Sequence, residues 1–206
     1  MIVVFEGIDG SGKTTLSRLL CEKMLSETDY DVLWLSEPTP FPIGGMIKHL
    51  INTQELNTFE QTLLFTADRE YMIRNYVLPN KDKIIILDRS FLSTYAYQIM
   101  SLDDTQTQLR DLLITLTEYS IRNFYVDILF YLDCEPKVAW ERVKNKEPES
   151  VKSIDYYTQI RKNYLEFLRG KHPHIKDVYV LNGAREISQT LLLVKNRILE
   201  QAAAVL

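Results

Sequence analysis

A cluster of glycines near the start of the chain most constrains its fold. The chain has seven glycines, and three of them lie in Gly7-Ile8-Asp9-Gly10-Ser11-Gly12-Lys13-Thr14. This run matches G-x-x-x-x-G-K-[ST] at every fixed place, with an apolar run before it and a helical pattern after it. Glycines let backbone N–H groups turn around an anion, and a helix N-terminus adds positive potential. The sequence therefore predicts a nucleoside triphosphate site, in which Lys13 meets the β- and γ-phosphates and Thr14 can ligate Mg²⁺.

Apolar runs alternate with helical patterns along the rest of the chain. Strands are expected at 2–5, 31–35, 83–87, 127–132 and 177–181. The runs at 83–87 and 127–132 are apolar on both faces, as strands inside a parallel sheet are. Helices are expected at 13–27, 43–53, 58–79, 91–101, 105–124, 136–146, 153–169 and 185–203. The pattern predicts an α/β fold: a three-layer, doubly wound, parallel five-stranded sheet flanked by helices, with ligands at the C-terminal strand ends.

Length, charge and cysteine content narrow the class of protein. A chain of 206 residues favours a single domain spanning 1–206. A net charge of −4 argues against binding to nucleic acid or to an anionic membrane by bulk charge. It does not exclude a small anionic partner held by a local cluster, such as the nucleotide substrate that the glycine loop predicts. No apolar run approaches the roughly 20 residues of a membrane span. Because Cys21 and Cys134 form no disulfide framework and no signal peptide is recognisable, a cytoplasmic location is expected.

Two segments have the composition of functional loops. Residues 37–42 contain three prolines, too many for a helix or an inner strand. The segment at about 144–155 is polar and charged, contains Pro148 and lies between two expected helices. We expect this second segment to be a mobile flap.

Two later segments carry side chains suited to a second, phosphorylated substrate. Phe65 and Arg69 are four residues apart and therefore share a helix face, which suits a base and a phosphate. Asp88 ends an apolar strand, where a second carboxylate near Mg²⁺ would lie, and Arg89 follows it. A core phenylalanine beside a surface ion pair is the purely structural alternative for the first pair.

The helix after Arg89 presents a hydroxyl, a phenol and an amide on one face. Thr94, Tyr97 and Gln98 have the spacing i, i+3 and i+4. Such a set is unusual for a core face, although a half-exposed polar face would also explain it. The three residues are therefore candidates for reading a nucleotide base and sugar.

Taken together, these segments resemble the thymidylate kinase family. The resemblance is carried, in order, by residues 5–15, 37–40 with 43–44, 64–69, 88–89 with 93–98, and 131–133, and it covers about residues 1–143. It implies a nucleotide kinase of the P-loop NTPase fold that transfers the γ-phosphate of ATP to dTMP, giving dTDP, as a step of nucleotide biosynthesis. It further implies Mg²⁺ as a cofactor and a homodimer.

The resemblance also implies a role for each matching residue. Asp9 would bond the acceptor sugar 3′-hydroxyl, Phe65 would stack on thymine and Arg69 would bind the acceptor phosphate. Arg89 would bridge the two phosphates, and Tyr97 would exclude a 2′-hydroxyl. The implied sets are catalytic Asp9, Lys13 and Arg89; ATP-binding Gly7, Ile8, Asp9, Gly10, Ser11, Gly12, Lys13, Thr14, Thr15 and Arg142; acceptor-binding Asp9, Glu37, Pro38, Phe65, Arg69, Arg89, Thr94, Tyr97 and Gln98; and metal-binding Thr14 and Asp88.

The chain departs from the family pattern at its arginines. Family members carry a catalytic arginine either in the phosphate loop, where this chain has Gly10, or in the flap, which here has only Lys144, Lys146 and Lys152. The arginine usual beside Glu37-Pro38 is also absent. Slow catalysis, a substituting lysine and an arginine from elsewhere all remain open.

Other activities of a phosphate-loop protein also remain open. One is a kinase for another deoxynucleoside monophosphate or for a deoxynucleoside, and the other is a nucleotide-binding protein with weak catalysis. A GTPase is disfavoured, because Asn145-Lys146-Glu147-Pro148 lacks the aspartate of the guanine-binding motif.

Overall fold

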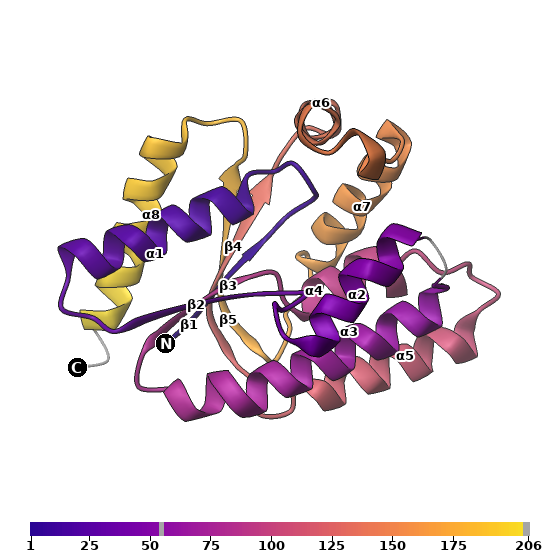
Figure 1. Cartoon of the computed structure of the whole chain (residues 1–206), viewed down its shortest axis with the longest axis horizontal. Helices are drawn as coiled ribbons and strands as arrows, with labels where there is room; N and C mark the ends of the chain where they lie inside the picture. Colours follow the sequence, from indigo (N-terminus) through magenta and orange to yellow (C-terminus); the bar gives the residue numbers. More distant parts are fainter. Residues whose placement is uncertain (54–55, 204–206) are drawn as a thin grey trace.

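Five parallel strands form the central sheet of the computed structural model, which describes residues 1–53 and 56–203. Their order in the sheet is β2-β3-β1-β4-β5 (Figure 1). The strands are β1 Ile2–Glu6, β2 Val32–Ser36, β3 Ile84–Asp88, β4 Val126–Asp133 and β5 Ile175–Asn182. The expected parallel, doubly wound sheet is confirmed, and each strand lies within one or two residues of its predicted place.

The helices lie on both faces of this sheet (Figure 1). One face packs against α1 and α8, and the core there joins Val3 and Phe5 to Leu16 and Val194. The other face carries Val4, which packs in a second core with residues of α3, α5 and α7. Successive β1 side chains thus point to opposite cores, as a strand buried on both faces requires. The main helices are α1 Lys13–Glu27, α2 Pro42–Thr53, α3 Thr58–Met72, α4 Phe91–Thr94, α5 Thr107–Ser120, α6 Pro136–Lys146, α7 Ile154–Phe167 and α8 Ile187–Ala203.

Two of the expected helices continue into turns that are not α-helical. The helix expected over 58–79 is α3 followed by a π-helical turn, η1 (Ile73–Val77), and a 3₁₀ turn, η2 (Leu78–Asn80). The helix expected over 91–101 is α4 followed by a second π-helical turn, η3 (Tyr95–Ile99). Such turns often occur at functional sites, and η3 carries Tyr97 and Gln98.

The segment expected to be a flap joins α6 to α7 through a short 3₁₀ turn, η4 (Pro148–Ser150). Helix α7 begins after Ser153, whose Oγ accepts a hydrogen bond from the backbone N–H of Tyr156 at 3.1 Å. The mobility of this segment stays a prediction. That residues 1–206 form a single domain also stays a prediction. Within the described ranges, no helix is both long and apolar enough to cross a membrane.

Candidate active site

The glycine loop links the end of β1 to the start of α1. Gly7, Gly10 and Gly12 have φ values of 150°, 80° and 98°, a region that favours glycine. A Cβ on Gly7 would also come within 2.8 Å of the carbonyl oxygen of Leu132. The glycines of the motif are therefore required by the backbone conformation of the loop. Lys13 is the first residue of α1. Thr14 and Thr15 follow it and are exposed.

The Lys13 side chain is buried and lies over its own loop. Its Nζ donates to the carbonyl oxygen of Ile8 at 3.2 Å and lies 3.6 Å from Asp9 Oδ1. Burial lowers the pKa of Lys13, and the nearby Arg89 guanidinium lowers it further, while Asp9 opposes both effects. A phosphate at the loop would add a second anion beside this ammonium group and accept a charge-assisted hydrogen bond from it.

Arg89 pairs with Asp9 across the top of the sheet. Among the described residues, Arg89 is the single non-glycine residue with a positive φ, at 76°. Its Nη2 forms an ion pair with Asp9 Oδ1, and its Nη1 donates to Ser93 Oγ at 3.0 Å. Burial raises the pKa of Asp9, but attraction to Arg89 and Lys13 outweighs it and leaves that pKa below its usual value. The carboxylate therefore stays ionised as an acceptor.

Tyr97 lies against the same pair. Its hydroxyl accepts from the backbone N–H of Asp9 at 3.1 Å and donates to Asp9 Oδ2 at 3.3 Å. The Arg89 guanidinium carbon is 5.3 Å from the centre of the Tyr97 ring. Burial and the nearby Asp9 carboxylate both raise the pKa of Tyr97, so the phenol keeps its proton.

Glu6 is a buried carboxylate that sequence reasoning missed. It is the last residue of β1 and has no exposed surface. It accepts from the backbone N–H of Ser90 at 2.7 Å, from Ser93 Oγ at 2.8 Å and from Tyr164 Oη at 2.8 Å. These bonds hold the turn in which Arg89 takes its strained backbone conformation. A charged residue ending an apolar strand just before the glycine loop was the available signal.

Arg69 is also fully buried, because it pairs with Glu37 from the proline-rich segment. Its Nε and Nη2 donate to the Glu37 carboxylate at 3.0 and 2.7 Å, and Nη2 also donates to Thr94 Oγ1 at 2.9 Å. Nη1 is buried and has no hydrogen-bond partner among the described residues. The sequence had suggested Glu37 and Arg69 as separate substrate contacts, and the surface ion pair considered for Arg69 is wrong. One edge of its guanidinium remains free for a ligand.

The proline-rich segment is fixed against the same helix. Thr39 donates to the Asp68 carboxylate through its backbone N–H at 2.8 Å and through Oγ1 at 2.6 Å. Pro38 follows a cis peptide bond after Glu37. Asp68 and Arg69, adjacent on α3, thereby bind both ends of the turn that carries Glu37.

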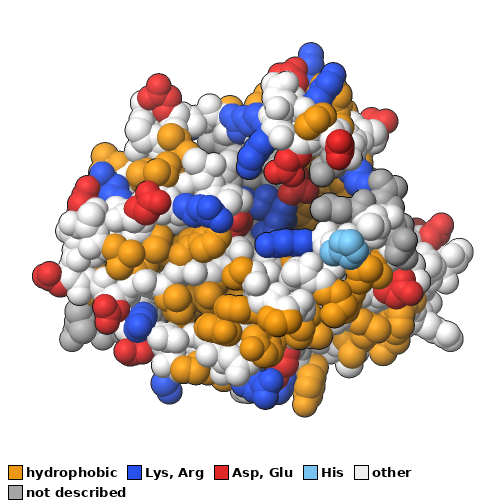
Figure 2. All heavy atoms as spheres, in the orientation of Figure 1, with side chains coloured by type: hydrophobic (Ala, Val, Ile, Leu, Met, Phe, Trp, Pro, Cys, Tyr) orange, Lys and Arg blue, Asp and Glu red, His pale blue; other side chains and the backbone are white. Residues whose placement is uncertain are grey.

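Asp88 and Gln98 are two further polar residues that the sequence suggested for the site. Asp88 ends β3, and its Oδ1 is buried without a hydrogen-bond partner in the described chain. Gln98 Nε2 donates to Gln61 Oε1 at 3.2 Å, and Phe65 is half-buried one turn after Gln61 on α3. The molecular face is hollowed between α6 and α2, and Lys, Arg, Asp and Glu side chains gather in and around the hollow (Figure 2).

Arg142 reaches the loop from α6. Its Nη1 donates to the carbonyl oxygens of Gly10 and Gly183, each at 3.2 Å. This places the expected ATP contact on the α6 side of the glycine loop. Arg142 therefore lies at the same loop as Lys13 and Asp9. Arg89 connects this loop to Ser93.

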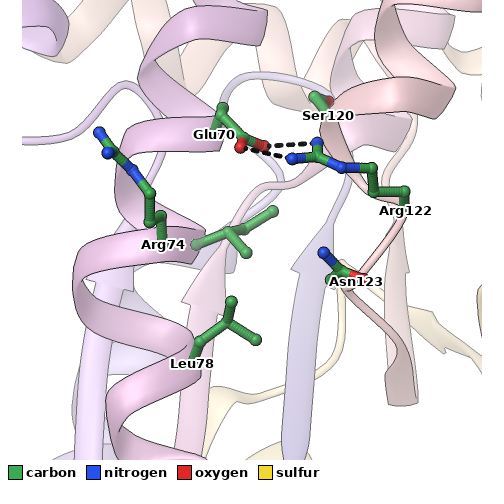
Figure 3. A pocket seen from close by; sticks show the side chains of 7 residues that line it. Glu70, Arg74, Leu78, Ser120, Arg122 and Asn123 are labelled. Carbon is green, nitrogen blue, oxygen red and sulfur yellow. Dashed lines mark hydrogen bonds and ion pairs between the residues drawn. The ribbon is translucent and has the colours of Figure 1, made fainter.

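A separate cavity of about 170 Å³ lies between the ends of α3 and α5 (Figure 3). Across it, Arg122 donates to Glu70 at 3.0 and 3.1 Å. None of the residues implied by the sequence lines this cavity, so it is not the predicted nucleotide site. The lining residues are Glu70, Ile73, Arg74, Leu78, Ser120, Arg122 and Asn123.

Comparison with known proteins identifies the family of the chain. The family model described as thymidylate kinase matches residues 5–191. A thymidylate kinase of Leptospira interrogans is 38% identical over 195 residues, covering 92% of this chain and 89% of that protein. One from Onion yellows phytoplasma is 27% identical over 210 residues, covering 97% of each. The crystal structure of thymidylate kinase from Ehrlichia chaffeensis has a TM-score of 0.71 and 26% identity, covering 96% of this chain and 98% of that one. The chain belongs to the thymidylate kinase family of phosphotransferases.

Proposed function

We propose that the residues described above carry out the reaction ATP + dTMP → ADP + dTDP. Membership of the thymidylate kinase family supports both ATP as phosphate donor and dTMP as acceptor. The observation that carries the assignment of residues is the position of Arg89. Arg89 is paired with Asp9 of the glycine loop on one side. On the other side it is bonded to Ser93, which directly precedes the segment that carries Thr94 and Gln98.

On the donor side, the loop N–H groups and Lys13 bind the phosphate chain of ATP. Phosphoryl transfer needs alignment and positive charge around the transferred group rather than covalent chemistry by the protein. Lys13 exchanges its bond to the Ile8 carbonyl for a phosphate oxygen. Arg142, which already bonds the Gly10 carbonyl, closes the outer side of the loop.

Mg²⁺ fits the chemistry of two groups at this loop. The unpartnered Oδ1 of Asp88 and the exposed hydroxyl of Thr14 are hard oxygen ligands, the kind that Mg²⁺ prefers. One or two protein ligands suffice, because Mg²⁺ keeps several waters and binds the substrate phosphates. When bound, the ion neutralises charge on the β- and γ-phosphate oxygens.

On the acceptor side, the free Nη1 edge of Arg69 binds the monophosphate substrate. Phe65 stacks on the base, and Thr94 and Gln98 read its edge. Tyr97 lies over the sugar and leaves no room for a 2′-hydroxyl, while Asp9 accepts from the 3′-hydroxyl. Because Glu37 accepts from Nε and Nη2 along one edge of Arg69, and Thr94 also accepts from Nη2, the guanidinium has a fixed orientation before substrate arrives.

A homodimer and a cytoplasmic location belong to the same proposal. Met46 on α2, Phe59 and Leu63 on α3, and Leu112 on α5 are large apolar side chains that are at least a third exposed. Helix α3 packs against both α2 and α5, so these residues lie on neighbouring elements. Light scattering of the purified chain would test the dimer, and Leu63→Glu should produce monomers.

A panel of acceptors tests the activity. ATP turnover with Mg²⁺ is measured with dTMP, dUMP, dCMP, dAMP, dGMP and thymidine. Turnover with dTMP and its loss in Lys13→Ala, with an unchanged circular dichroism spectrum, are the expected results. Turnover with thymidine alone would indicate a deoxynucleoside kinase, and ATP binding without any turnover would indicate a non-catalytic nucleotide-binding protein.

A further inference from the structure

Gln61 and Gln98 form an amide pair whose orientation is set by the backbone. Gln61 Nε2 donates to the carbonyl oxygen of Leu56 at 2.9 Å. A carbonyl oxygen can only accept, so Gln61 must direct its NH₂ group there and its Oε1 toward Gln98. Gln98 then has to present its own NH₂ group to Gln61, as it does at 3.2 Å.

The other end of the Gln98 amide faces no protein partner. Within the described ranges, no hydrogen bond reaches Gln98 Oε1, although the side chain is only 7% exposed. Gln98 lies one turn after Thr94, which bonds Arg69, and opposite the helix that carries Phe65. The series of hydrogen bonds from the Leu56 carbonyl through Gln61 therefore ends at Gln98 Oε1. This oxygen is an acceptor without a partner among the described residues, and it lies beside the groups assigned to the acceptor nucleotide.

We propose that Gln61 is a positioning residue that sets base specificity by fixing the Gln98 amide with its oxygen toward the base. This inference rests on the proposed function. A pyrimidine that meets this oxygen must carry a hydrogen on N3, as thymine and uracil do. Cytosine has a lone pair on N3, which would face the lone pairs of Oε1 and leave both groups unsatisfied.

Gln61 blocks the alternative orientation of the Gln98 amide. Rotating the Gln98 amide by half a turn would offer a donor to cytosine, but it would bring Oε1 of Gln98 against Oε1 of Gln61. A site whose buried polar groups are left unpaired rejects the wrong substrate far more strongly than a loose apolar pocket does. The Leu56 carbonyl therefore fixes the orientation of the Gln61 amide, and Gln61 in turn fixes the orientation of Gln98 toward a base that Gln61 does not contact.

Substitution of Gln61 by residues of different hydrogen-bonding character tests this relay. Steady-state kcat/KM is measured for dTMP, dUMP and dCMP. In Gln61→Leu the Gln98 amide can rotate, so dCMP use relative to dTMP should rise about tenfold. In Gln61→Glu an oxygen still faces Gln98, and the wild-type preference should be retained. In Gln61→Lys a donor faces Gln98, and the preference should shift furthest toward dCMP.

Two further variants make the outcome decisive. Gln189→Leu, on the exposed surface of α8, should leave all three ratios at wild-type values. In a Gln98→Leu background, Gln61→Leu should have no further effect on the ratio of dTMP to dCMP. An unchanged ratio in both Gln61→Leu and Gln61→Lys, with dTMP turnover intact, would overturn the proposal. If the wild-type chain phosphorylates no monophosphate, the proposed function fails first.

Discussion

Gly10 lies directly against Ala139, so that the glycine loop and α6 are in backbone contact. A Cβ at position 10 would come within 2.3 Å of the carbonyl oxygen of Ala139. Gly10 also has a φ of 80°, which strains any other residue. The arginine that some family members carry at this point of the loop therefore cannot be accommodated without moving α6.

Introducing that arginine should harm the protein instead of improving it. We expect Gly10→Arg to lower the free energy of unfolding by about 2 kcal/mol or more and to weaken ATP binding, because α6 must shift. Gly45→Ala is the matched control, since a Cβ on Gly45 in α2 meets no atom within 4 Å. Urea unfolding and ATP titration measure both effects. Wild-type stability with faster turnover in Gly10→Arg would contradict this prediction.

The Glu37–Arg69 pair allows stability and catalysis to be separated. Both side chains are almost completely buried. Glu37→Gln leaves an uncompensated buried guanidinium and should cost about 3–5 kcal/mol of stability. Replacing both residues with methionine should recover most of that stability but not the use of dTMP. If the double variant regains wild-type kcat/KM for dTMP, Arg69 is not an acceptor ligand.

Glu6 should influence the rate through the position of Arg89. Glu6→Gln can no longer accept from all of its donors, and an error of about 1 Å in a catalytic group can cost about 10²-fold in rate. We expect kcat to fall by about that factor with little change in the KM for ATP. Tyr164→Phe removes one of the same bonds and should have a smaller effect. A loss of kcat fully accounted for by a lower melting temperature would count against this positioning role.

The strands and the glycine loop could be read from the sequence because their signals are local. The run at residues 84–87 is apolar on both faces, and the loop glycines need backbone angles that few other residues adopt. The π turns were not predicted, because they differ from α-helical turns in their hydrogen bonding and carry no residue pattern of their own in this sequence. The hydrogen-bond partners of buried polar side chains could not be predicted, because they come from distant parts of the sequence.

Glu6 illustrates that limit. It bonds Ser90 and Tyr164, which are 84 and 158 positions away in the chain. A charged residue at the end of an apolar strand marks the position as unusual, but nothing in the sequence nearby names the residues that bond to it. The pairing of Glu37 with Arg69, 32 positions apart, is hidden for the same reason. Polar contacts between distant segments depend on which strand ends and helices the topology brings together.

His172 should make stability depend on pH. It is packed between Phe91 and Phe167, its Nε2 lies 3.1 Å from Glu118 Oε1, and His174 is adjacent. Burial lowers the pKa of His172 below 6.5, in spite of Glu118. The unfolded state therefore takes up a proton at a pH where the folded state does not. Its contribution to stability is present above about pH 6.5 and is lost as pH falls from there toward the folded pKa.

The variant His172→Gln should flatten this dependence. It keeps a donor for Glu118 but cannot gain a charge in this pH range. Urea unfolding of wild type and variant from pH 8 to pH 5 measures the slope, and His49→Gln, at an exposed site on α2, is the control. Parallel slopes for wild type and His172→Gln would refute the assignment.

Lys152 is the flap lysine best placed to replace the missing arginine. Lys144 lies 4.7 Å above the centre of the Trp140 ring, and Lys146 is 3.8 Å from Glu147. No ion pair is found for Lys152 in the described chain, and it immediately precedes the cap of α7. The first turn of α7 carries Tyr156, whose ring is 6.3 Å from that of Tyr97 beside Arg89. The start of α7 therefore lies beside Tyr97, which in turn contacts Arg89.

Removing the charge of Lys152 should lower kcat more than removing either of the other two. We expect Lys152→Met to reduce kcat by about 10²-fold, the usual effect of losing one donor to a developing negative charge. Lys144→Met and Lys146→Met are matched controls and should stay within a few-fold of wild type. Lys152→Arg should retain or raise kcat, because its planar group can bind two phosphate oxygens at once. If all three methionine variants keep wild-type kcat, no flap lysine substitutes for the arginine.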